Sequence, residues 1–366
     1  MRQLFGLRLL SPLVALALTA CGAAPQSGSE APASATSAAT GQKLVVYSGR
    51  SESLVAPLFA QFTEATGIAV EARYGDTAEL AATILEEGAN SPADVFFAQD
   101  AGALGALGAA DMLSELPTAT LDKVEARFRS GNNDWVGVSA RARVVVYNTA
   151  NLNESELPAS ITAFTDPQWQ GRVGWAPTNG SFQSFITAMR SELGDEATLA
   201  WVQGMLANEV KMYERNAAIV QAVAAGEIDI GFVNHYYLYQ LQRDNGGELA
   251  AANYYPQAGD VGALVNIAGL GQLKTAENSA AAQAFFDYML AEQGQTYFAE
   301  QTFEYPLSAG VAADARLKPL AKIQTPEIDL NTLSDLQGSL KLLQDAGRCS
   351  KRPGVRIQHV TAFAVL

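Results

Sequence analysis

Two adjacent tyrosines, Tyr236 and Tyr237, are the residues of this chain best suited to bind a metal ion. They follow the apolar run 228–233 and stand between His235 and a further aromatic residue, Tyr239. A free phenol keeps its proton to about pH 10, but a bound cation stabilises the phenolate and displaces the proton. Hard, highly charged cations prefer such oxygen ligands to sulfur. The pair therefore predicts a metal site, with an aromatic helix face packed on the core as the alternative.

The position of the pair in the chain sets a condition on its geometry. Neighbouring side chains of a strand point to opposite faces, so consecutive tyrosines reach one ion only where the chain leaves strand geometry. Tyr236 and Tyr237 are therefore expected on the turn, or on the first helical residues, after a strand that ends near residue 233. Tyr239 is expected to point into packing, and His235 to have a structural role.

Composition limits the class of protein. The chain has 366 residues, of which 48% are hydrophobic, so it can bury a sizeable core and form two domains. Its formal net charge is -14 and its pI is near 4.6, which argues against binding to nucleic acid phosphates. An acidic surface is compatible with a soluble protein that binds a cation.

Several kinds of catalytic site lack the residues they need. The only cysteines are Cys21 and Cys349, and the only histidines are His235 and His359, so zinc hydrolase and Cys/His nucleophile schemes are excluded. Neither a phosphate-binding Gly-x-x-x-x-Gly-Lys-Ser/Thr loop nor paired carboxylates at a recognisable spacing are present. The sequence predicts a binding protein, not an enzyme.

The N-terminal segment resembles a bacterial lipoprotein signal. Basic residues precede a mainly apolar stretch at 9–18, which is too short to span a bilayer and leads into Leu-Thr-Ala-Cys at Cys21. Residues 1–20 are therefore predicted to be a signal peptide, and cleavage would leave Cys21 to carry the lipid. Residues 21–42 have no apolar period and are predicted to be a flexible tether. This places the folded part on the extracytoplasmic face of the cytoplasmic membrane.

From residue 43 onward, short β-branched runs alternate with segments of helical period, which predicts an α/β protein. Helices are expected after the first two strands, with a stop at Gly67, and over 279–291. In a parallel sheet the functional loops lie at the carboxyl ends of the strands. The strands are predicted at 44–47, 68–74, 92–97, 144–147, 173–175, 228–233 and 261–268.

Four stretches, taken in order, carry a family resemblance that covers roughly residues 43–346: Val46–Gly49, Ser91–Phe97, Ser139–Asn148 and Asn234–Tyr237. They resemble the ferric-ion-binding periplasmic proteins of bacterial iron ABC transporters. The resemblance implies a two-lobed type 2 periplasmic-binding-protein fold with a ligand cleft between the lobes, which close on the ligand. It implies lobe 1 at 43–141 and 265–315, lobe 2 at 142–264, C-terminal helices packing on lobe 2 at 316–347, and a tail of unassigned role at 348–366.

The resemblance also implies the ligands. Tyr236 and Tyr237 would supply phenolate oxygens to Fe(III), beside a synergistic anion that is carbonate, phosphate or citrate-like. Arg141 matches the anion-binding arginine, and its planar fork suits an oxyanion, whereas Arg143 competes if the strand register is shifted. The other anion-binding positions, some of them at an expected helix start, are Asn179, Gly180, Ser181, Asn216 and Asn234.

The chain departs from the family at two ligand positions. Many relatives have a histidine and a glutamate where this chain has Ser51 and Gln99, which are weaker ligands for a trivalent cation. An exogenous anion or water must then fill more of the coordination shell. Arg50 and Gln99 are candidates to hold the anion from the first lobe, and Asp100 or Tyr74 to complete the shell. The alternatives are that Asp100 caps a helix and that Tyr74 packs at a strand end.

The sequence thus predicts a monomeric, lipid-anchored solute-binding protein that captures Fe(III) with an anion and delivers it to an ABC transporter permease. The alternative keeps the fold but replaces iron by a small anionic or organic solute, such as a phosphonate, a sulfonate or a thiamine-like compound. The absence of the histidine and the glutamate, at Ser51 and Gln99, is what keeps this alternative open.

Overall fold

The computed structural model describes residues 42–257 and 259–349. The predicted signal peptide 1–20, Cys21 and the tether up to residue 41 lie outside these residues, as does the predicted tail from residue 350 onward. The last helix, α11 (Leu336–Cys349), extends two residues into the segment 348–366. None of the helices in the described part of the chain is both long enough and apolar enough to cross a membrane.

A mixed sheet of ten strands lies at the centre of the fold. Its order is β2-β1-β3-β9-β4-β7-β5-β6, and β8 and β10 also pair with β4. The strands are β1 (Lys43–Ser48), β2 (Ala69–Tyr74), β3 (Val95–Ala98), β4 (Val136–Asn148), β5 (Val173–Trp175), β6 (Lys211–Met212), β7 (Ile230–Asn234), β8 (Ala251–Tyr254), β9 (Val265–Gln272) and β10 (Tyr305–Pro306).

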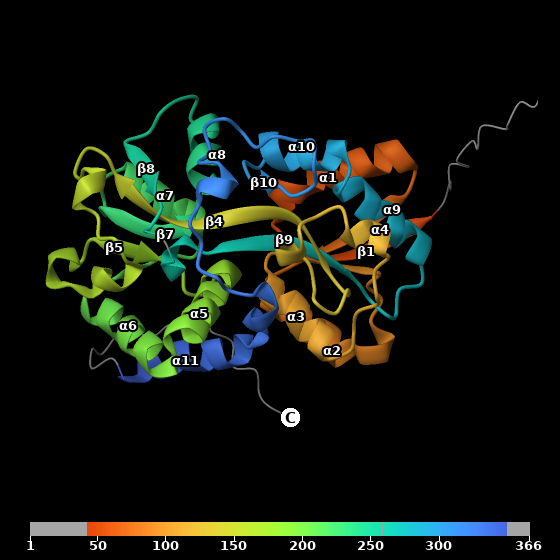
Figure 1. The fold of residues 1–366 in the computed structure, drawn as a ribbon, viewed down its shortest axis with the longest axis horizontal. Coiled ribbons are helices and arrows are strands. Elements are labelled where there is room, and N and C mark those ends of the chain that lie inside the picture. Colours follow the sequence, from red (N-terminus) through yellow and green to blue (C-terminus); the bar gives the residue numbers. More distant parts are fainter. Residues whose placement is uncertain (1–41, 258, 350–366) are drawn as a thin grey trace, which may run out of the picture. The chain divides into compact units, whose positions relative to one another are not determined.

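The sheet has two halves that share the long strand β4. This strand pairs with β9 as far as Ala142, with β7 from Arg143 onward and with β8 from Val145 onward. The first half contains β1, β2, β3, β9 and β10, and the second contains β5, β6, β7 and β8. In Figure 1, β4 and β9 pass from one group of helices to the other. The two groups of elements are thus joined by crossing strands.

Helices cover both halves (Figure 1). Those of the first half include α1, α2, α3, α9 and α10, and those of the second include α5 to α8. The bounds are α1 (Glu52–Thr66), α2 (Thr77–Glu87), α3 (Ala101–Ala109), α4 (Thr118–Leu121), α5 (Gly180–Leu193), α6 (Asp195–Ala207), α7 (Asn216–Ala224), α8 (Tyr236–Asp244), α9 (Ser279–Met289) and α10 (Glu292–Glu300).

Buried apolar side chains form the cores of the two halves. In the first half, Phe59 and Phe62 of α1 pack against Phe285 of α9, with ring centroids 5.5 and 5.2 Å apart. Helix α1 ends where Gly67 adopts φ 74°, a left-handed conformation that glycine takes without steric cost, which confirms the predicted stop. In the second half, Trp201 packs against Phe232 of β7.

Two strands differ most from their sequence-based prediction, whereas β3 begins three residues and β7 two residues later than predicted. The strand predicted at 144–147 runs from Val136 to Asn148, and all 13 of its residues are buried. Its arginines and serine broke the apolar pattern, so the sequence concealed its length. The strand predicted to begin at Val261 begins at Val265, because the Asp260 carboxylate accepts from the Gly262 N–H and closes a 3-10 turn over Val261–Ala263.

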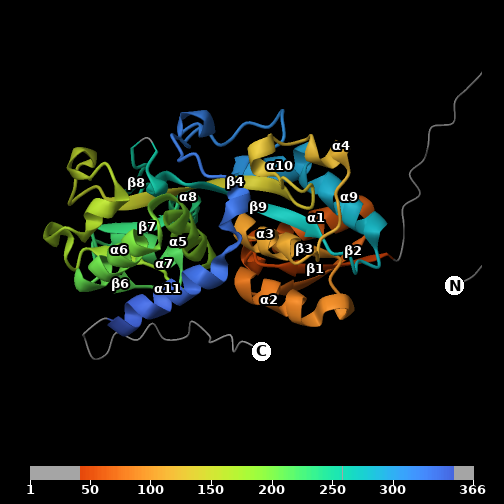
Figure 2. The same cartoon turned by 60° about the horizontal axis from the view of Figure 1, so that its bottom comes forward.

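The C-terminal segment contacts both halves. The 3-10 helix at Leu330–Ser334 packs on α3 of the first half, whereas α11 packs on α5 and α6 of the second (Figure 2). The segment 316–347, expected to pack on the second lobe, therefore bridges the two groups of elements. The lobe boundaries implied by the resemblance remain predictions.

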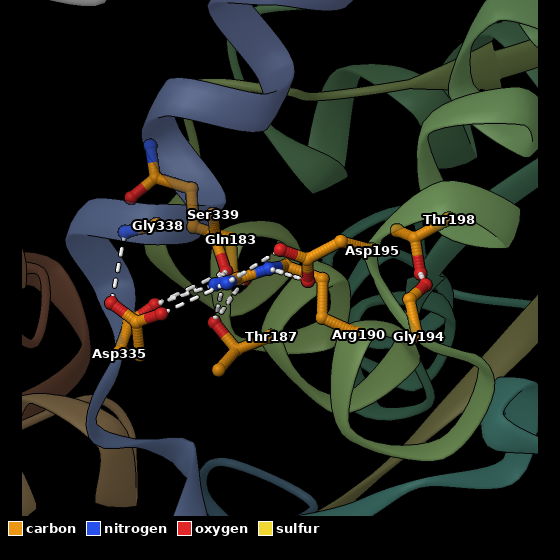
Figure 3. A network of polar contacts seen from close by, with 9 residues as sticks. All are labelled: Gln183, Thr187, Arg190, Gly194, Asp195, Thr198, Asp335, Gly338 and Ser339. Carbon is orange, nitrogen blue, oxygen red and sulfur yellow. Dashed lines mark hydrogen bonds and ion pairs between the residues drawn. The ribbon is translucent and has the colours of Figure 1, made fainter.

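Arg190 of α5 joins α11 to the second half, as Figure 3 shows. Its guanidinium lies 2.8 Å from an Asp195 carboxylate oxygen and 2.9 Å from one of Asp335. It also donates to the Ser339 hydroxyl at 3.0 Å, which lies 2.7 Å from the Thr187 hydroxyl. Since the Arg190 side chain is only 13% exposed, these contacts are partly shielded from water.

Replacing Arg190 by methionine is expected to lower the free energy of unfolding by about 1–3 kcal/mol, because it removes the partner of polar groups on α6, on α11 and on Asp335, the residue before α11. Urea unfolding followed by circular dichroism measures the change. Lys341→Met is the matched control, since Lys341 lies on α11, is 75% exposed, and forms with Asp345 a pair that should contribute less than about 0.5 kcal/mol. Equal effects of the two substitutions would contradict the role given to Arg190.

Candidate metal centre

The tyrosine pair lies where strand β7 ends and helix α8 begins. Tyr236 is the first residue of α8 and Tyr237 the second, with His235 between them and the strand. The two rings lie 4.3 Å apart, centroid to centroid, at an interplanar angle of 35°. Tyr236 is buried and Tyr237 is half-buried. The expectation that the chain leaves strand geometry at the pair is confirmed.

The electrostatic setting of Tyr236 keeps its phenol neutral in the absence of a cation. Burial raises the pKa of Tyr236 well above its ordinary value, and the neighbouring Tyr237 hydroxyl raises it further. The positive charge of Arg50 acts in the opposite direction, and the negative charge of Glu304 adds to the rise. A bound cation must therefore displace the proton of this phenol.

Three buried arginines surround the pair. Arg50 follows β1 and is 1% exposed, and Arg141 and Arg143 on β4 are 1% and 2% exposed. Since Arg141 and Arg143 are two positions apart on one strand, their side chains leave the same face. The charge of each of the three arginines acts on Tyr236 or is affected by it. The sequence-based prediction gave Arg141 and Arg143 as alternative anion-binding residues, whereas β4 places both side chains at the site.

The two arginines of β4 differ in their hydrogen bonds. Arg143 donates to the Ser181 hydroxyl at 3.4 Å and to the Phe232 carbonyl at 3.2 Å. Arg141 has no hydrogen-bond partner among the described residues at any of its three guanidinium nitrogens. Burial lowers the pKa of both guanidinium groups, to about 9 for Arg143. A guanidinium is strongly basic, and it is the cationic form that binds an oxyanion. A buried cation without partners is costly, so Arg141 is the better anion donor.

Four of the side chains predicted to bind the anion are linked by hydrogen bonds. The Asn179 Oδ1 caps α5 by accepting from the Ser181 N–H at 3.1 Å, and it also accepts from Asn216 Nδ2 at 3.2 Å. Asn234 Nδ2 donates to the Ser181 hydroxyl at 3.3 Å. Helices α5 and α7 both begin in this group, and the N–H groups at a helix start attract anions.

Gly180, the first residue of α5, faces the first half of the protein. A Cβ atom at this position would lie 3.6 Å from Asp100 Oδ2 and 3.9 Å from Thr77 Cβ. Asp100 caps α3, accepting from the Ala103 N–H at 3.1 Å, which confirms the capping alternative. Burial raises the pKa of Asp100, while Arg141 acts to lower it. The starts of α2, α3 and α5 therefore meet beside Arg141.

The remaining predicted residues occupy different settings. Gln99 donates its N–H to the Thr77 hydroxyl at 3.2 Å, and its buried Nε2 has no partner among the described residues. Ser51 is exposed at the start of α1 and makes no capping hydrogen bond with its side chain. Tyr74 stacks on Phe59 with ring centroids 6.4 Å apart, as expected for packing at a strand end.

Glu304 is a site residue that the sequence did not reveal. It is 0% exposed, and its Oε2 accepts from Arg50 Nη2 at 2.6 Å and from the Thr302 hydroxyl at 3.0 Å. The ion pair joins residues 254 positions apart, so no local pattern pointed to it. Because Glu304 neutralises Arg50, it sets how much positive charge reaches the tyrosine pair.

His235 has both ring nitrogens engaged by the backbone. Its Nδ1 accepts from the Ala142 N–H at 3.1 Å, so Nε2 carries the proton and donates to the Phe303 carbonyl at 2.8 Å. Burial lowers the pKa of His235 to about 3, which keeps the ring neutral. The structural role predicted for this residue is confirmed, and a role as metal ligand is not available to it.

The chemistry of the site is therefore that of oxygen donors and cationic side chains. Within residues 42–257 and 259–349, no group of three or more His, Cys, Asp or Glu side chains is placed to hold a metal ion. The arrangement suits a hard cation bound by phenolates together with an oxyanion bound by Arg141.

Comparison with known proteins gives the family. Residues 57–325 match the family model described as bacterial extracellular solute-binding protein. The chain is 35% identical over 307 residues to the major ferric iron-binding protein of Neisseria meningitidis serogroup B, covering 83% of this chain and 92% of that protein.

Solved structures agree. Iron-bound HitA from Pseudomonas aeruginosa is 36% identical with a TM-score of 0.80, covering 84% of this chain and 99% of that one. A Trichodesmium protein (IdiA, FutA) in complex with iron and citrate is 31% identical with a TM-score of 0.69, covering 83% and 99%. These structures share the two-lobed type 2 binding-protein fold. The chain therefore belongs to the bacterial extracellular solute-binding proteins, among the ferric-ion-binding periplasmic proteins of that family.

Proposed function

We propose that this protein is an extracytoplasmic solute-binding lipoprotein that captures Fe(III) with a synergistic anion and delivers it to the permease of an ABC transporter, without catalysis of its own. The observation that carries the proposal is the placement of Tyr236 and Tyr237 at the start of α8, beside the guanidinium of Arg141, which has no hydrogen-bond partner within residues 42–257 and 259–349. Relatives at 35% and 34% identity are named as ferric iron-binding proteins.

The phenols bind the ion by exchanging their protons for it. Phenolate is a hard ligand, and a trivalent cation outweighs the burial that keeps the Tyr236 phenol neutral. Arg50 favours the charged form of this phenol. Capture of the ion would therefore turn the buried Tyr236 and the half-buried Tyr237 into two charged ligands.

The charges around the pair call for an anion. Arg50, Arg141 and Arg143 are buried cations, whereas Asp100 and Glu304 are the buried carboxylates whose charges act on them. With these groups ionised, two phenolates and one ferric ion leave the site with two positive charges in excess. A divalent oxyanion, such as carbonate or hydrogen phosphate, or a citrate-like carboxylate compensates this charge. Such an anion also fills coordination positions that Ser51 and Gln99 do not.

Delivery would use the two halves of the fold. Side chains from both halves line the site, since Arg50 and Asp100 lie on the first, and Ser181 and Tyr236 on the second. Opening about β4 and β9 would separate these groups and release the ion to the permease. The protein would act as a monomer, held at the membrane by lipid on Cys21.

Addition of ferric ion with bicarbonate or citrate to the mature protein is expected to produce a visible phenolate-to-iron charge-transfer band. Absorption spectroscopy measures the band, and equilibrium dialysis measures how many ferric ions each protein molecule binds. A colourless protein that retains no iron would refute the proposal. Calorimetric binding of a phosphonate, a sulfonate or a thiamine-like compound in place of iron would favour the alternative function.

Replacing Arg141 by glutamine is expected to raise, by at least about tenfold, the anion concentration at which the charge-transfer band reaches half of its maximal absorbance. The reason is that charge-assisted hydrogen bonds to an oxyanion are lost. The Arg141→Lys variant should need an anion concentration between those of the unaltered protein and Arg141→Gln, because lysine keeps the charge but not the planar fork. Titration of bicarbonate at fixed iron measures the change. Arg127→Gln is the control, since this arginine is 48% exposed and pairs with Glu125. A larger effect of Arg143→Gln would assign the anion to Arg143 instead.

A further inference from the structure

The turn Gln301–Glu304, between α10 and β10, is held by side chains along α8 and by the residue before this helix. The His235 Nε2 donates to the Phe303 carbonyl at 2.8 Å, and the Gln240 Nε2 to the Thr302 carbonyl at 3.0 Å. The Arg243 Nη1 donates to the Gln301 carbonyl at 2.6 Å. Three successive carbonyls of one turn are thus bonded to the segment that carries Tyr236 and Tyr237.

The backbone of this turn has an uncommon conformation. Phe303 has φ 56°, in the left-handed region, where a bulky side chain crowds its own backbone. Its ring is buried and packs under the guanidinium of Arg316 at 4.6 Å and beside that of Arg243 at 5.5 Å. Such a conformation persists only where the surroundings determine it, and strained residues of this kind are found at functional sites.

The left-handed residue directs Glu304 into the interior. The Glu304 N–H donates to the Phe298 carbonyl at 2.9 Å, and its carboxylate meets Arg50 at 2.6 Å. Arg50 keeps two buried guanidinium nitrogens without partners in the described residues, and its charge acts on both tyrosines. The position of the Arg50–Glu304 pair therefore depends on the same turn that α8 holds.

His235 is the link closest to the metal-binding pair. It immediately precedes Tyr236, lies edge-on to its ring at 5.8 Å, and stacks on Tyr305 at 4.7 Å. Its Nδ1 holds Ala142 of β4, between Arg141 and Arg143. One neutral ring thus bonds the crossing strand on one side and the strained turn on the other.

We propose that His235 is a positioning residue, which locks the turn Gln301–Glu304 against the start of α8, so that the tyrosine pair and the Arg50–Glu304 pair keep a fixed arrangement. This inference rests on the proposed function, because the arrangement it maintains is that of the ferric-ion site. The hydrogen bond to Phe303 is the contact that carries the role, since it acts on the left-handed residue directly.

Three substitutions separate the two hydrogen bonds of His235. Glutamine places its amide nitrogen near the position of Nε2 and keeps the donor to Phe303, whereas asparagine reaches only the position of Nδ1 and keeps the acceptor for Ala142. Phenylalanine removes both. We expect His235→Asn and His235→Phe to weaken ferric-ion binding by about 10–100-fold, as loss of groups behind metal ligands does. His235→Gln should stay within about threefold of the unaltered protein.

Hydrogen exchange of the metal-free protein tests the lock independently of iron. The amide of Glu304 should exchange faster in His235→Asn and His235→Phe, but not in His235→Gln. The control Gln242→Ala, on α8, should change neither the exchange nor the iron affinity. Unchanged exchange in His235→Asn would overturn the proposal, and so would faster exchange with undiminished iron affinity. Failure of the unaltered protein to bind iron would instead refute the proposed function, which distinguishes the two.

A second pair of variants applies if the His235 variants do not fold. Phe303→Gly and Phe303→Ala both remove the ring, but only glycine takes φ 56° without strain. If the left-handed turn places Glu304, its amide should exchange about tenfold faster in Phe303→Ala than in Phe303→Gly. Equal exchange in the two variants would overturn the role given to the turn.

Discussion

Replacing Tyr236 and Tyr237 together by phenylalanine is expected to abolish the visible charge-transfer band and to weaken ferric-ion binding by at least about a hundredfold. Both phenolates are lost, and the described residues hold no cluster of His, Cys, Asp or Glu side chains that would replace them. The two rings stay in place, because phenylalanine keeps the contact at 4.3 Å between their centroids. Absorption spectroscopy and competition with a chelator of known affinity measure the two effects.

The controls for this variant lie on the same helix. Tyr239→Phe should leave the band unchanged, since the Tyr239 hydroxyl donates to the Arg316 carbonyl at 3.3 Å and its ring packs on Phe303. Each single variant, Tyr236→Phe or Tyr237→Phe, should retain a weaker, shifted band from the remaining phenolate. A band that survives in the double variant would show that other residues bind the ion.

Ferric-ion binding is expected to strengthen steeply with rising pH. Burial raises the pKa of Tyr236 above its ordinary value, so the phenol is protonated in the metal-free protein throughout the neutral range. Protons and iron therefore compete for the same oxygens, and falling pH favours the protons. With two phenols deprotonated on binding, the affinity should rise by about a hundredfold per pH unit, or about tenfold for each proton released.

Proton release measured in weakly buffered solution checks this linkage directly. The unaltered protein should release about one proton more per ferric ion than Tyr237→Phe does, under the same anion and pH. The anion and the hydrated ion release the same number of protons with both proteins, so these contributions cancel in the difference. A difference near zero would mean that the Tyr237 phenol does not bind the metal as phenolate.

The structure shows the surroundings of Ser51 and Gln99, the two positions at which the chain departs from the family pattern. Ser51 is exposed, and the amide nitrogen of Gln99 is a buried donor without a protein partner among the described residues. A donor is suited to an anion and not to a cation. We therefore expect the first half of this protein to contribute to the anion, through Arg50 and Gln99, more than to the metal.

The sequence determined those features that depend on local patterns. Alternating β-branched runs and helical periods predicted the α/β fold, and Gly67 and Asp100 marked a helix end and a helix start that the structure confirms. The order of four short stretches indicated the family, and the family comparison confirms it. The tyrosine pair was recognisable from the sequence because its two phenol groups are adjacent. Adjacent phenols can both bind one ion only where the chain leaves strand geometry, which the sequence also indicated.

The tertiary structure decided which charged groups meet at the pair. Strand β4 appeared too short in sequence because its buried arginines interrupt the apolar pattern, and only pairing with β7 and β9 shows its length. Arg141 and Arg143 are chemically alike, but in the part of the chain that the structure describes Arg143 has hydrogen-bond partners and Arg141 has none. Arg50 and Glu304 form their ion pair across 254 positions. Local periodicity records which residues are apolar, whereas burial and charge pairing arise only when distant segments come into contact.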